Sequence, residues 1–414
     1  MSLVLPFRAI RPSNEFVSQV ASLPYDVMTK EEGQKAVGGN PLSFLHVEKS
    51  EIDVPEGTKS DDRLIYEKAK ENFIKMRDNK IFKQDEKPLY YIYRQQMGSQ
   101  VQTGIVGLVS VAEYEAGKIK KHELTRKDKE KDRICHIQAV NAQTGPVFIA
   151  YRSMPAINEV VEETVKGNAE YDFTADDGVV HKVWIVSEPK AIENIRKSFL
   201  AVKALYIADG HHRAAAAVEV ARLKRKKRNM PNEIREYDLF MAVLFPHNQL
   251  KVMDYNRAVK DLNSLTEEKF LKKIGINFEI RDNFKEKSPQ KPHEFGMYLR
   301  GNWYQLTPQK GIYDGTDPIA SLDATILQST LLSPVLGIDD PRTDQRIKFV
   351  GGIRGMAELE KLVDKEDYAV AFSLYPTTLE QIMKVADVGK IMPPKSTWFE
   401  PKLRSGIFIH DLGE

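Results

Sequence analysis

One short segment of the sequence combines residue types that bind phosphate groups. An apolar run, Leu205–Ala208, leads directly into Asp209, Gly210, His211, His212 and Arg213. Four alanines follow, so the pattern predicts a strand that turns into a helix, with Asp209 as the N-cap. Gly210 would let a ligand approach the backbone closely. Because unpaired N–H groups and the positive end of the helix dipole favour an anion, the segment predicts a phosphate site.

The side chains of the same segment add hydrogen-bond donors. Arg213 can hold phosphate oxygens with two parallel hydrogen bonds, and His211 and His212 lie at the same helix start. Two other interpretations are a capped surface helix with chance histidines and a metal site. Adjacent residues of a helix point about 100° apart, so the two imidazoles are poor co-ligands of one metal ion. Phosphate binding is the favoured interpretation, and no metal ligands are assigned.

The composition indicates a soluble protein. The 414 residues carry 61 basic and 59 acidic side chains, a formal charge of +2, which demands neither nucleic acid nor an anionic membrane as a partner. The single cysteine, Cys135, excludes an intrachain disulfide and favours a reducing compartment. No apolar run approaches the ~20 residues that span a bilayer, and Met1–Arg11 does not resemble a signal peptide. We therefore expect a cytoplasmic protein that acts on a small molecule.

Short apolar runs alternate with longer amphipathic runs along the chain, which predicts an α/β fold. Expected strands lie at 88–94, 104–111, 147–151, 183–186, 205–208, 239–245 and 368–374. Expected helices lie at 62–79, 266–274, 356–363 and 378–388, with a hairpin at 296–306. The length predicts two domains, and a basic stretch with proline and asparagine at 228–236 divides them into 1–235 and 236–414.

After a predicted strand, the sequence continues with glycine, any residue, histidine and arginine at 210–213. This pattern resembles the phosphate-binding turn of the ParB/sulfiredoxin superfamily. The fuller resemblance is to a prokaryotic family of that superfamily known as a domain of unknown function, and it covers essentially the whole chain. Besides residues 208–213, the motifs that carry it are Pro24–Val27, Asn40–Leu45, His122–Thr125, Lys131–Arg133, Met392–Thr397 and Phe399–Lys402. Each motif alone is weak, but their common order is specific.

This resemblance implies a ParB/sulfiredoxin-like first domain packed on a second mixed α/β domain that completes the site. Relatives in the superfamily include free L-serine kinases, so the implied reaction is phosphoryl transfer to a small hydroxyl compound. Free L-serine, which would give O-phosphoserine, is the expected acceptor. Mg²⁺ is the expected cofactor, and ATP, ADP and pyrophosphate remain open as donors. Since the sequence has no Walker-type loop, the 209–213 turn would have to hold any nucleotide.

Two other activities of the superfamily are disfavoured. The sulfiredoxin turn has a cysteine before the histidine, whereas this chain has His211 there. No helix-turn-helix candidate with a basic recognition face stands out, which argues against ParB-type DNA binding. The remaining alternatives are a phosphatase for phosphoserine or a similar ester, and a nucleotide-binding regulator without turnover. A catalytic carboxylate distinguishes them, because only an enzyme would depend on it.

Phosphoryl transfer to a hydroxyl needs a carboxylate that accepts the proton. In the serine kinases of the superfamily this base comes from the N-terminal part, so the resemblance implies Asp26, which follows a Pro-Tyr pair. Glu123 is the second candidate for the base, and His212 is a further catalytic candidate. The structural alternative for Asp26 is that it caps a helix beginning near Thr29.

Two further segments are expected to contact phosphate. Arg133 ends a charged run but falls where the pattern turns apolar, so a solvated surface position and an inward, phosphate-binding position both remain open. Lys395, Ser396 and Thr397 follow two prolines that fix an extended backbone. Their side chains suit a phosphate or a substrate carboxylate, and a rigid C-terminal loop that packs on the first domain is the alternative.

The substrate pocket itself is expected to involve three polar residues: Asn40, His46 and His122. Each lies in or beside a motif that carries the resemblance. For Asn40 and His46 a purely structural role is at least as well supported.

Overall fold

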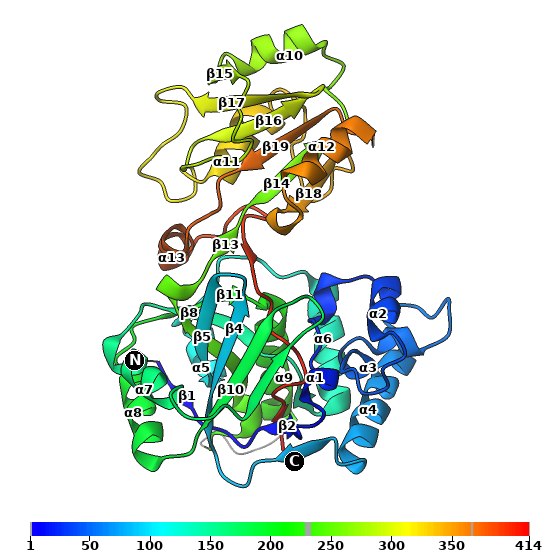
Figure 1. Ribbon diagram of the computed structural model, residues 1–414, viewed down its shortest axis with the longest axis vertical. Coiled ribbons are helices and arrows are strands. Elements are labelled where there is room, and N and C mark those ends of the chain that lie inside the picture. The colour runs from blue at the N-terminus through cyan, green and yellow to red at the C-terminus, as the bar shows by residue number, and fades with distance from the viewer. Residues whose placement is uncertain (1, 228–232, 366, 414) are drawn as a thin grey trace. The chain divides into compact units, whose positions relative to one another are not determined.

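The computed structural model describes residues 2–227, 233–365 and 367–413 and divides the chain into two compact units (Figure 1). The first unit comprises Met1–Leu250 and Pro401–Glu414, and the second comprises Lys251–Glu400. This division differs from the expected one after residue 235, because Leu239–Pro246 is a strand inside the sheet of the first unit. Residues 228–232, part of the stretch expected to form the boundary, lie outside the described residues.

The first unit is built on a nine-stranded mixed sheet. Its strands, in sheet order, are β6 (Ile119–Lys120), β11 (Leu205–Asp209), β8 (Val147–Tyr151), β12 (Leu239–Pro246), β5 (Gln100–Ser110), β4 (Tyr90–Met97), β10 (Val180–Val186) and β9 (Tyr171–Thr174), with β1 (Val4–Leu5) on β5. The pairs β11–β6 and β12–β8 are parallel, and the other pairs are antiparallel. Every residue of β8 and β12 is buried, which explains why both strands are continuous apolar runs in the sequence.

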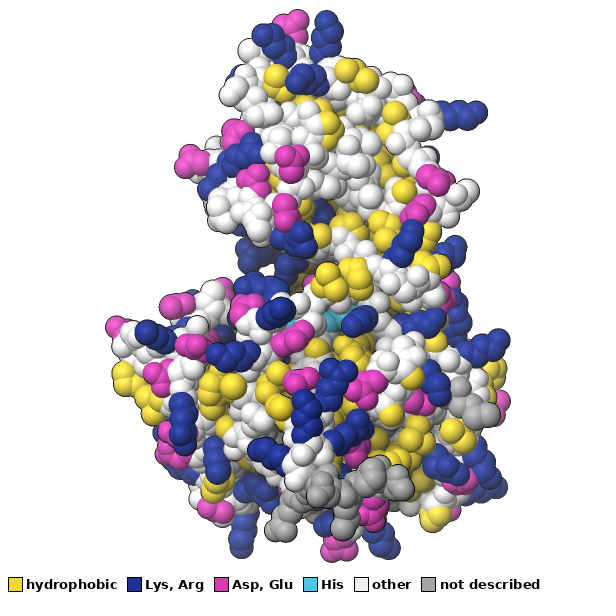
Figure 2. Space-filling view, turned by 180° about the vertical axis from the view of Figure 1, so that it is seen from behind, with side chains coloured by type: hydrophobic (Ala, Val, Ile, Leu, Met, Phe, Trp, Pro, Cys, Tyr) yellow, Lys and Arg dark blue, Asp and Glu magenta, His cyan; other side chains and the backbone are white. Residues whose placement is uncertain are grey.

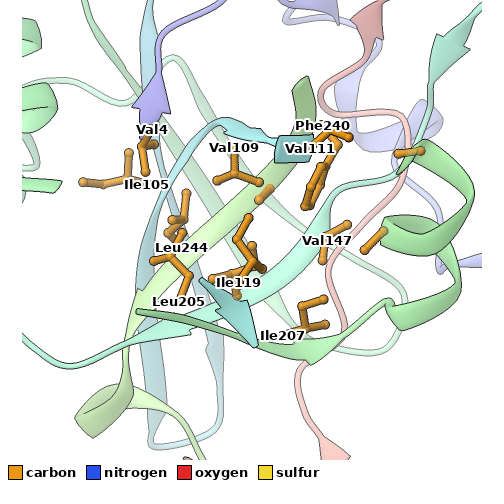
Figure 3. Close-up of a cluster of buried hydrophobic side chains, with 14 of the residues drawn as sticks. Val4, Ile105, Val109, Val111, Ile119, Val147, Leu205, Ile207, Phe240 and Leu244 are labelled. Carbon is orange, nitrogen blue, oxygen red and sulfur yellow. The ribbon is translucent and has the colours of Figure 1, made fainter. Parts of the chain in front are cut away.

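Branched aliphatic side chains from these strands form the main core of the first unit (Figure 3). Small residues of α9 join it, since Ala214, Ala217 and Ala221 are buried there. The helices of the first unit are α1 (Val17–Val20), α2 (Lys30–Val37), α3 (Leu45–Glu48), α4 (Arg63–Asp78), α5 (Val111–Glu115), α6 (Lys127–Val140), α7 (Pro155–Thr164), α8 (Pro189–Leu200) and α9 (His211–Lys227). Helix α6 packs between α9 and α4, and this group positions the candidate site.

The second unit has a six-stranded antiparallel sheet. Its strands, in sheet order, are β15 (Phe278–Asp282), β17 (Asn302–Pro308), β16 (Phe295–Leu299), β19 (Val370–Leu374), β14 (Tyr255–Val259) and β18 (Ile347–Gly351). The expected hairpin at 296–306 is confirmed as β16–β17, and Arg300 and Gly301 at its turn both have positive φ, +46° and +84°. The helical segments are α10 (Glu267–Ile274), α11 (Asp323–Leu327), the π-helix η5 (Gln328–Leu332), α12 (Met356–Lys365) and α13 (Leu379–Asp387).

The C-terminal segment belongs to the first unit. Strand β21 (His410–Asp411) pairs with β7 (Ala142–Gln143), and Ile409 forms a bridge with Ile10. Short pairings of this kind hold 401–414 against the first unit, so that Lys402 becomes available to the helix start at 209–213.

The surface carries both signs of charge. Lysine and arginine side chains alternate with aspartate and glutamate over the face seen in Figure 2, in keeping with the nearly balanced totals of 61 and 59. Within residues 2–227, 233–365 and 367–413, no helix is long and apolar enough to cross a membrane.

Candidate functional site

The predicted strand, turn and helix are present at residues 205–227. Strand β11 ends at Asp209, Gly210 has a φ of +86°, and α9 begins at His211. The Gly210 carbonyl accepts a hydrogen bond of 3.0 Å from the Ala214 N–H, so Gly210 and not Asp209 holds the N-cap position. The prediction for Asp209 was wrong by one residue, because only glycine adopts this left-handed conformation without strain.

Asp209 has a different role at the turn. Its carboxylate accepts a hydrogen bond of 2.8 Å from the Gly210 N–H and one of 2.9 Å from the Lys402 ammonium. Burial alone would raise the pKa of Asp209, but the Lys402 charge and hydrogen bond lower it below its usual value. Asp209 therefore stays ionised and fixes a lysine at the start of α9.

Arg213 is the most constrained side chain of the segment. Its Nη1 donates to the Pro146 carbonyl at 2.9 Å, and its Nη2 lies 3.5 Å from Oδ1 of Asp26. The Arg213 side chain is 13% exposed, and its Nε is buried without a hydrogen-bond partner among the described residues. Burial opposes the charge, but the Asp26 and Glu48 carboxylates outweigh it and raise the pKa of Arg213. The guanidinium is thus held in one position and keeps an unused donor.

A second buried guanidinium lies beside the first. Arg133 points inward, which is one of the two positions expected for it. Its Cζ lies 3.8 Å from the centroid of the Tyr25 ring. The Cζ of Arg213 lies 5.7 Å from the same centroid. Arg133 is paired with Asp132 at 2.8 Å, which accounts for part of its charge. The Tyr25 ring therefore lies near both guanidinium groups.

A buried carboxylate, Glu48, balances these cations. It is 2% exposed, accepts a hydrogen bond from the Thr144 hydroxyl, and lies 3.9 Å from Nη1 of Arg133. Burial alone would raise the pKa of Glu48, but the positive groups around it, Arg133 and Arg213 among them, lower it. A cavity of about 20 Å³ lies between these side chains, which is room for roughly one water. A phosphate ligand would have to approach from outside this cavity.

Asp26 is the carboxylate that faces outward beside Arg213. It lies in the short helix η1 (Tyr25–Val27), and its side chain is 40% exposed. Helix α2 is capped by Thr29, whose hydroxyl accepts from the Glu32 N–H while the Glu32 carboxylate accepts from the Thr29 N–H. The alternative that Asp26 caps this helix is therefore wrong, because Thr29 is the N-cap of α2.

His212, the second residue of α9, contacts the residue that precedes α6. Its Nε2 accepts a hydrogen bond of 3.0 Å from the backbone N–H of Arg126. Burial lowers the pKa of His212, and the charge of Asp26 opposes that shift. His212 is therefore neutral near pH 7 and available as a hydrogen-bonding group, not as a fixed cation.

His211 and His122 form a buried pair behind the turn. Their rings meet edge to face with centroids 4.6 Å apart, and burial lowers the pKa of His122 to about 4 and that of His211 well below its usual value. Both rings are uncharged near pH 7, so neither adds positive charge for a phosphate. The second candidate base, Glu123, is 44% exposed and lies 4.0 Å from Nδ1 of His211.

The Lys395–Thr397 segment belongs to the second unit. The Lys395 carbonyl accepts a hydrogen bond of 3.2 Å from Arg257, and the Ser396 hydroxyl donates to the Pro393 carbonyl at 2.7 Å. These contacts lie within the second unit, whereas the packing-loop alternative placed the segment against the first domain. A role of this segment at the phosphate turn remains a prediction.

Asn40 and His46 contact each other. His46 Nε2 lies 3.1 Å from the Asn40 carbonyl, and Nδ1 lies 2.8 Å from Oδ2 of Asp53. The Asp53 hydrogen bond is the largest influence on the imidazole, and it raises the pKa of His46. Asn40 also donates to the Gln19 carbonyl at 2.8 Å. These contacts fit the structural role considered for both residues.

Three residues of the site were not predicted as ligands: Tyr25, Glu48 and Lys402. Tyr25 and Lys402 each stand in a motif that carried the resemblance, which was the available signal. Glu48 had none, because an acidic residue at the end of a short helix is ordinary in sequence. Lys402 is 193 positions from its partner, so no local pattern could join them.

Comparison with known proteins identifies the family. The sequence profile described as "Protein of unknown function (DUF1015)" matches residues 4–325. The chain belongs to this family. The match runs through the 209–213 turn and into the second unit. No curated protein matches the chain.

The chain is also similar to several solved structures at low identity. A conserved hypothetical protein from Pyrococcus furiosus is 15% identical with a TM-score of 0.36, over 74% of this chain and 97% of that one. A free serine kinase in complex with AMP is 14% identical with a TM-score of 0.37, over 74% and 92%. SbnI from Staphylococcus aureus, truncated at its C-terminus, is 10% identical with a TM-score of 0.38, over 72% and 85%.

Proposed function

We propose that the chain transfers a phosphoryl group to the hydroxyl of a small substrate, with free L-serine as acceptor and O-phosphoserine as product. One observation carries the proposal: the outward-facing carboxylate of Asp26 lies 3.5 Å from the Arg213 guanidinium, at the start of α9. A base for the acceptor hydroxyl and a site for the transferred phosphate are the two parts that this reaction needs side by side. Because Thr29 caps α2, capping does not explain the presence of Asp26.

The first part of the reaction is phosphate binding. The N–H groups at the start of α9 and the Arg213 guanidinium would hold the phosphate oxygens of the donor. Gly210 keeps the backbone open to the ligand, and Lys402, fixed by Asp209, would add a further positive charge. The donor could be ATP, ADP or pyrophosphate, since each presents the same phosphate chemistry to this turn.

The second part is proton transfer. Asp26 would accept the proton of the substrate hydroxyl as the new O–P bond forms and the donor O–P bond breaks. Arg213 orients Asp26 and neutralises charge on the transferred group, and this supports in-line attack on a bound phosphate. His212, whose pKa is raised by the charge of Asp26 against the effect of burial, could hydrogen-bond the acceptor. Glu123 is the alternative base, on the side of His211.

Mg²⁺ is compatible with these residues. Among the described residues, no group of three or more His, Cys, Asp or Glu side chains could hold a metal ion. Mg²⁺ at phosphoryl-transfer sites commonly uses one or two carboxylates together with substrate phosphates and water. Asp26 is exposed and could supply such a carboxylate, and Mg²⁺ bound there would neutralise phosphate charge.

The test is phosphorus NMR of the purified chain with L-serine, Mg²⁺ and, in separate samples, ATP, ADP or pyrophosphate. We expect O-phosphoserine with one of the donors and a rate about 10²–10⁴-fold lower in Asp26→Asn, which removes the base. Asp172→Asn, an exposed aspartate of the same unit, is the matched control and should keep the rate of the unmodified chain.

Other results would favour the alternatives. If no donor yields O-phosphoserine, the serine-kinase proposal is rejected, and hydrolysis of added O-phosphoserine would then identify a phosphatase. Nucleotide binding without any turnover would identify a regulator. If O-phosphoserine forms equally fast in Asp26→Asn, Asp26 is not the base, and Glu123→Gln becomes the decisive variant.

A further inference from the structure

A buried arginine lies on β14, next to the edge strand β18 of the sheet of the second unit. Arg257 is 3% exposed and stands on β14, directly opposite Phe349 on β18 and Phe372 on β19. Its Cζ lies 5.1 Å from the centroid of the Phe349 ring. Arginine is almost never fully buried unless it is paired, so this position requires an explanation.

No carboxylate among the described residues forms an ion pair with Arg257. Its guanidinium donates to the backbone carbonyls of Lys395, at 3.2 Å, and Tyr255. Burial lowers the pKa of Arg257 to about 10, because no carboxylate offsets the loss of water. Lys395 follows two prolines and has a φ of +55° in a turn, and in this conformation its carbonyl meets the guanidinium. Carbonyls orient the charge but do not neutralise it, and further N–H donors remain for a ligand.

Arg257 lines a cavity of about 250 Å³ in the second unit. Phe349, Pro393 and Pro394 give the cavity apolar walls. Gln328 also lines it and is the first residue of the π-helix η5, a rare conformation that is frequent at functional sites. The cavity is large enough for a small metabolite, unlike the single-water space beside Glu48.

The remaining charged lining consists of two aspartates and a second arginine, Arg342. Asp339 and Asp340 line the same cavity; Asp340 is paired with Arg342 at 2.9 Å, and Asp339 accepts a hydrogen bond of 2.6 Å from the Ser333 hydroxyl. A phosphate dianion would be attracted by Arg257 but repelled by Asp339, whereas the charges of Asp340 and Arg342 offset each other. A neutral ligand would leave the guanidinium unbalanced. A small zwitterion satisfies both ends of the cavity.

We propose that this cavity binds a free α-amino acid, whose carboxylate pairs with Arg257 and whose ammonium group faces Asp339 and Asp340. The apolar walls would accommodate a small side chain. All residues of this site belong to the second unit, so the proposal does not depend on phosphoryl transfer at the 209–213 turn.

Isothermal titration calorimetry of the full chain with glycine and with L-alanine tests the proposal, because neither has a hydroxyl to accept phosphate. We expect binding of at least one of them, and at least tenfold weaker binding in Arg257→Met. Arg354→Met, which removes a 61% exposed arginine of the same unit, should keep the affinity of the unmodified chain. Asp339→Asn should weaken amino-acid binding more than acetate binding, since only the amino acids carry an ammonium group.

Melting temperature without ligand separates loss of the site from loss of the fold. Arg257→Met should melt no lower than the unmodified chain, because methionine removes an unbalanced buried charge. Equal affinity for the amino acids in Arg257→Met and the unmodified chain, or no binding of either amino acid, would overturn the proposal. Arg257-dependent binding of inorganic phosphate in preference to both amino acids would overturn the assignment of a zwitterion.

Discussion

Buried arginines in the two units differ in how their charge is balanced. In the first unit, Arg133 and Arg213 lie among the carboxylates of Asp132, Glu48 and Asp26, and the pKa of each guanidinium is raised. In the second unit, Arg257 lies between phenylalanines and backbone carbonyls, and its pKa is lowered. Burial opposes the charge in all three cases, so the carboxylates make the difference. A balanced network is suited to hold a charge during chemistry, whereas an unbalanced one is suited to bind a charged ligand.

The largest stability effect should come from breaking the balanced network. Arg133→Met leaves the buried Glu48 carboxylate with one cation fewer, and we expect the free energy of unfolding to fall by about 3–5 kcal/mol. Urea denaturation at pH 7 would measure it, with Glu48→Gln and the double variant closing a cycle. The double variant should lose less than the two single changes together. A loss below about 1 kcal/mol would contradict the importance of this balance.

The second unit also contains a buried carboxyl, Asp323, whose Oδ1 lies 3.9 Å from Nε2 of His293. It is 8% exposed, its Oδ1 accepts a hydrogen bond of 3.0 Å from the His293 N–H, and its Oδ2 has no partner among the described residues. Burial raises the pKa of Asp323 to about 7, which the His293 hydrogen bond only partly opposes. A carboxyl with a raised folded-state pKa contributes stability below its unfolded pKa, about 4, and loses it as pH rises to about 7.

Asp323→Asn should remove this pH dependence. We expect the variant to be more stable than the unmodified chain at pH 8, by an amount of the order of 2–4 kcal/mol, and similar to it near pH 4. Hydrogen exchange of amides in α11 and β16 as a function of pH would report on the second unit directly. A variant whose stability follows pH as steeply as the unmodified chain would show that Asp323 is not the titrating group.

A smaller gain in the free energy of unfolding is expected from a substitution of Arg257. Arg257→Met replaces an unbalanced charge by an apolar side chain of similar reach, and we expect a gain of about 1 kcal/mol in the absence of ligand. Hydrogen exchange of the β14 amides is the measurement, and Arg354→Met is the control for net charge. A loss of several kcal/mol would mean that the guanidinium is balanced as well as those of the first unit.

The smallest effect should come from the cap beside the first network. Thr29→Ala removes the hydrogen bond from the Glu32 N–H to the Thr29 hydroxyl, at a cost of about 1 kcal/mol, but it leaves the Asp26 carboxylate in place. We therefore expect phosphoryl transfer to fall less than tenfold, measured as the initial rate of O-phosphoserine formation. A fall as large as that of Asp26→Asn would show that Asp26 depends on the cap for its position.

Local patterns predicted much of the fold. The strand expected at 147–151 coincides with β8, and the helix expected at 62–79 is α4 with Asp62 as its cap. Both follow from side-chain periodicity and capping, which act over a few residues. The boundary after 235 failed because composition marked a loop, whereas burial of the next apolar strand between β8 and β5 decides where the first unit ends.

The site was predictable only in its local part. The turn at 209–213 was found because strand, glycine and helix follow one another in the sequence. The inward orientation of Arg133 had a signal in the apolar residues after it. The ion pair between Lys402 and Asp209 had no signal in the sequence, because it depends on the path of the chain through the whole second unit.

That path has a consequence for synthesis on the ribosome. The first unit needs residues from both ends of the chain, and Lys251–Glu400 must be made before Pro401–Glu414 appears. At about 5–20 residues per second, the first unit waits roughly ten to thirty seconds for its last segment. During this interval the Asp209 carboxylate lacks its lysine, and β7 lacks β21. The nascent chain thus presents an unfinished phosphate turn until residues 401–413 have been synthesised.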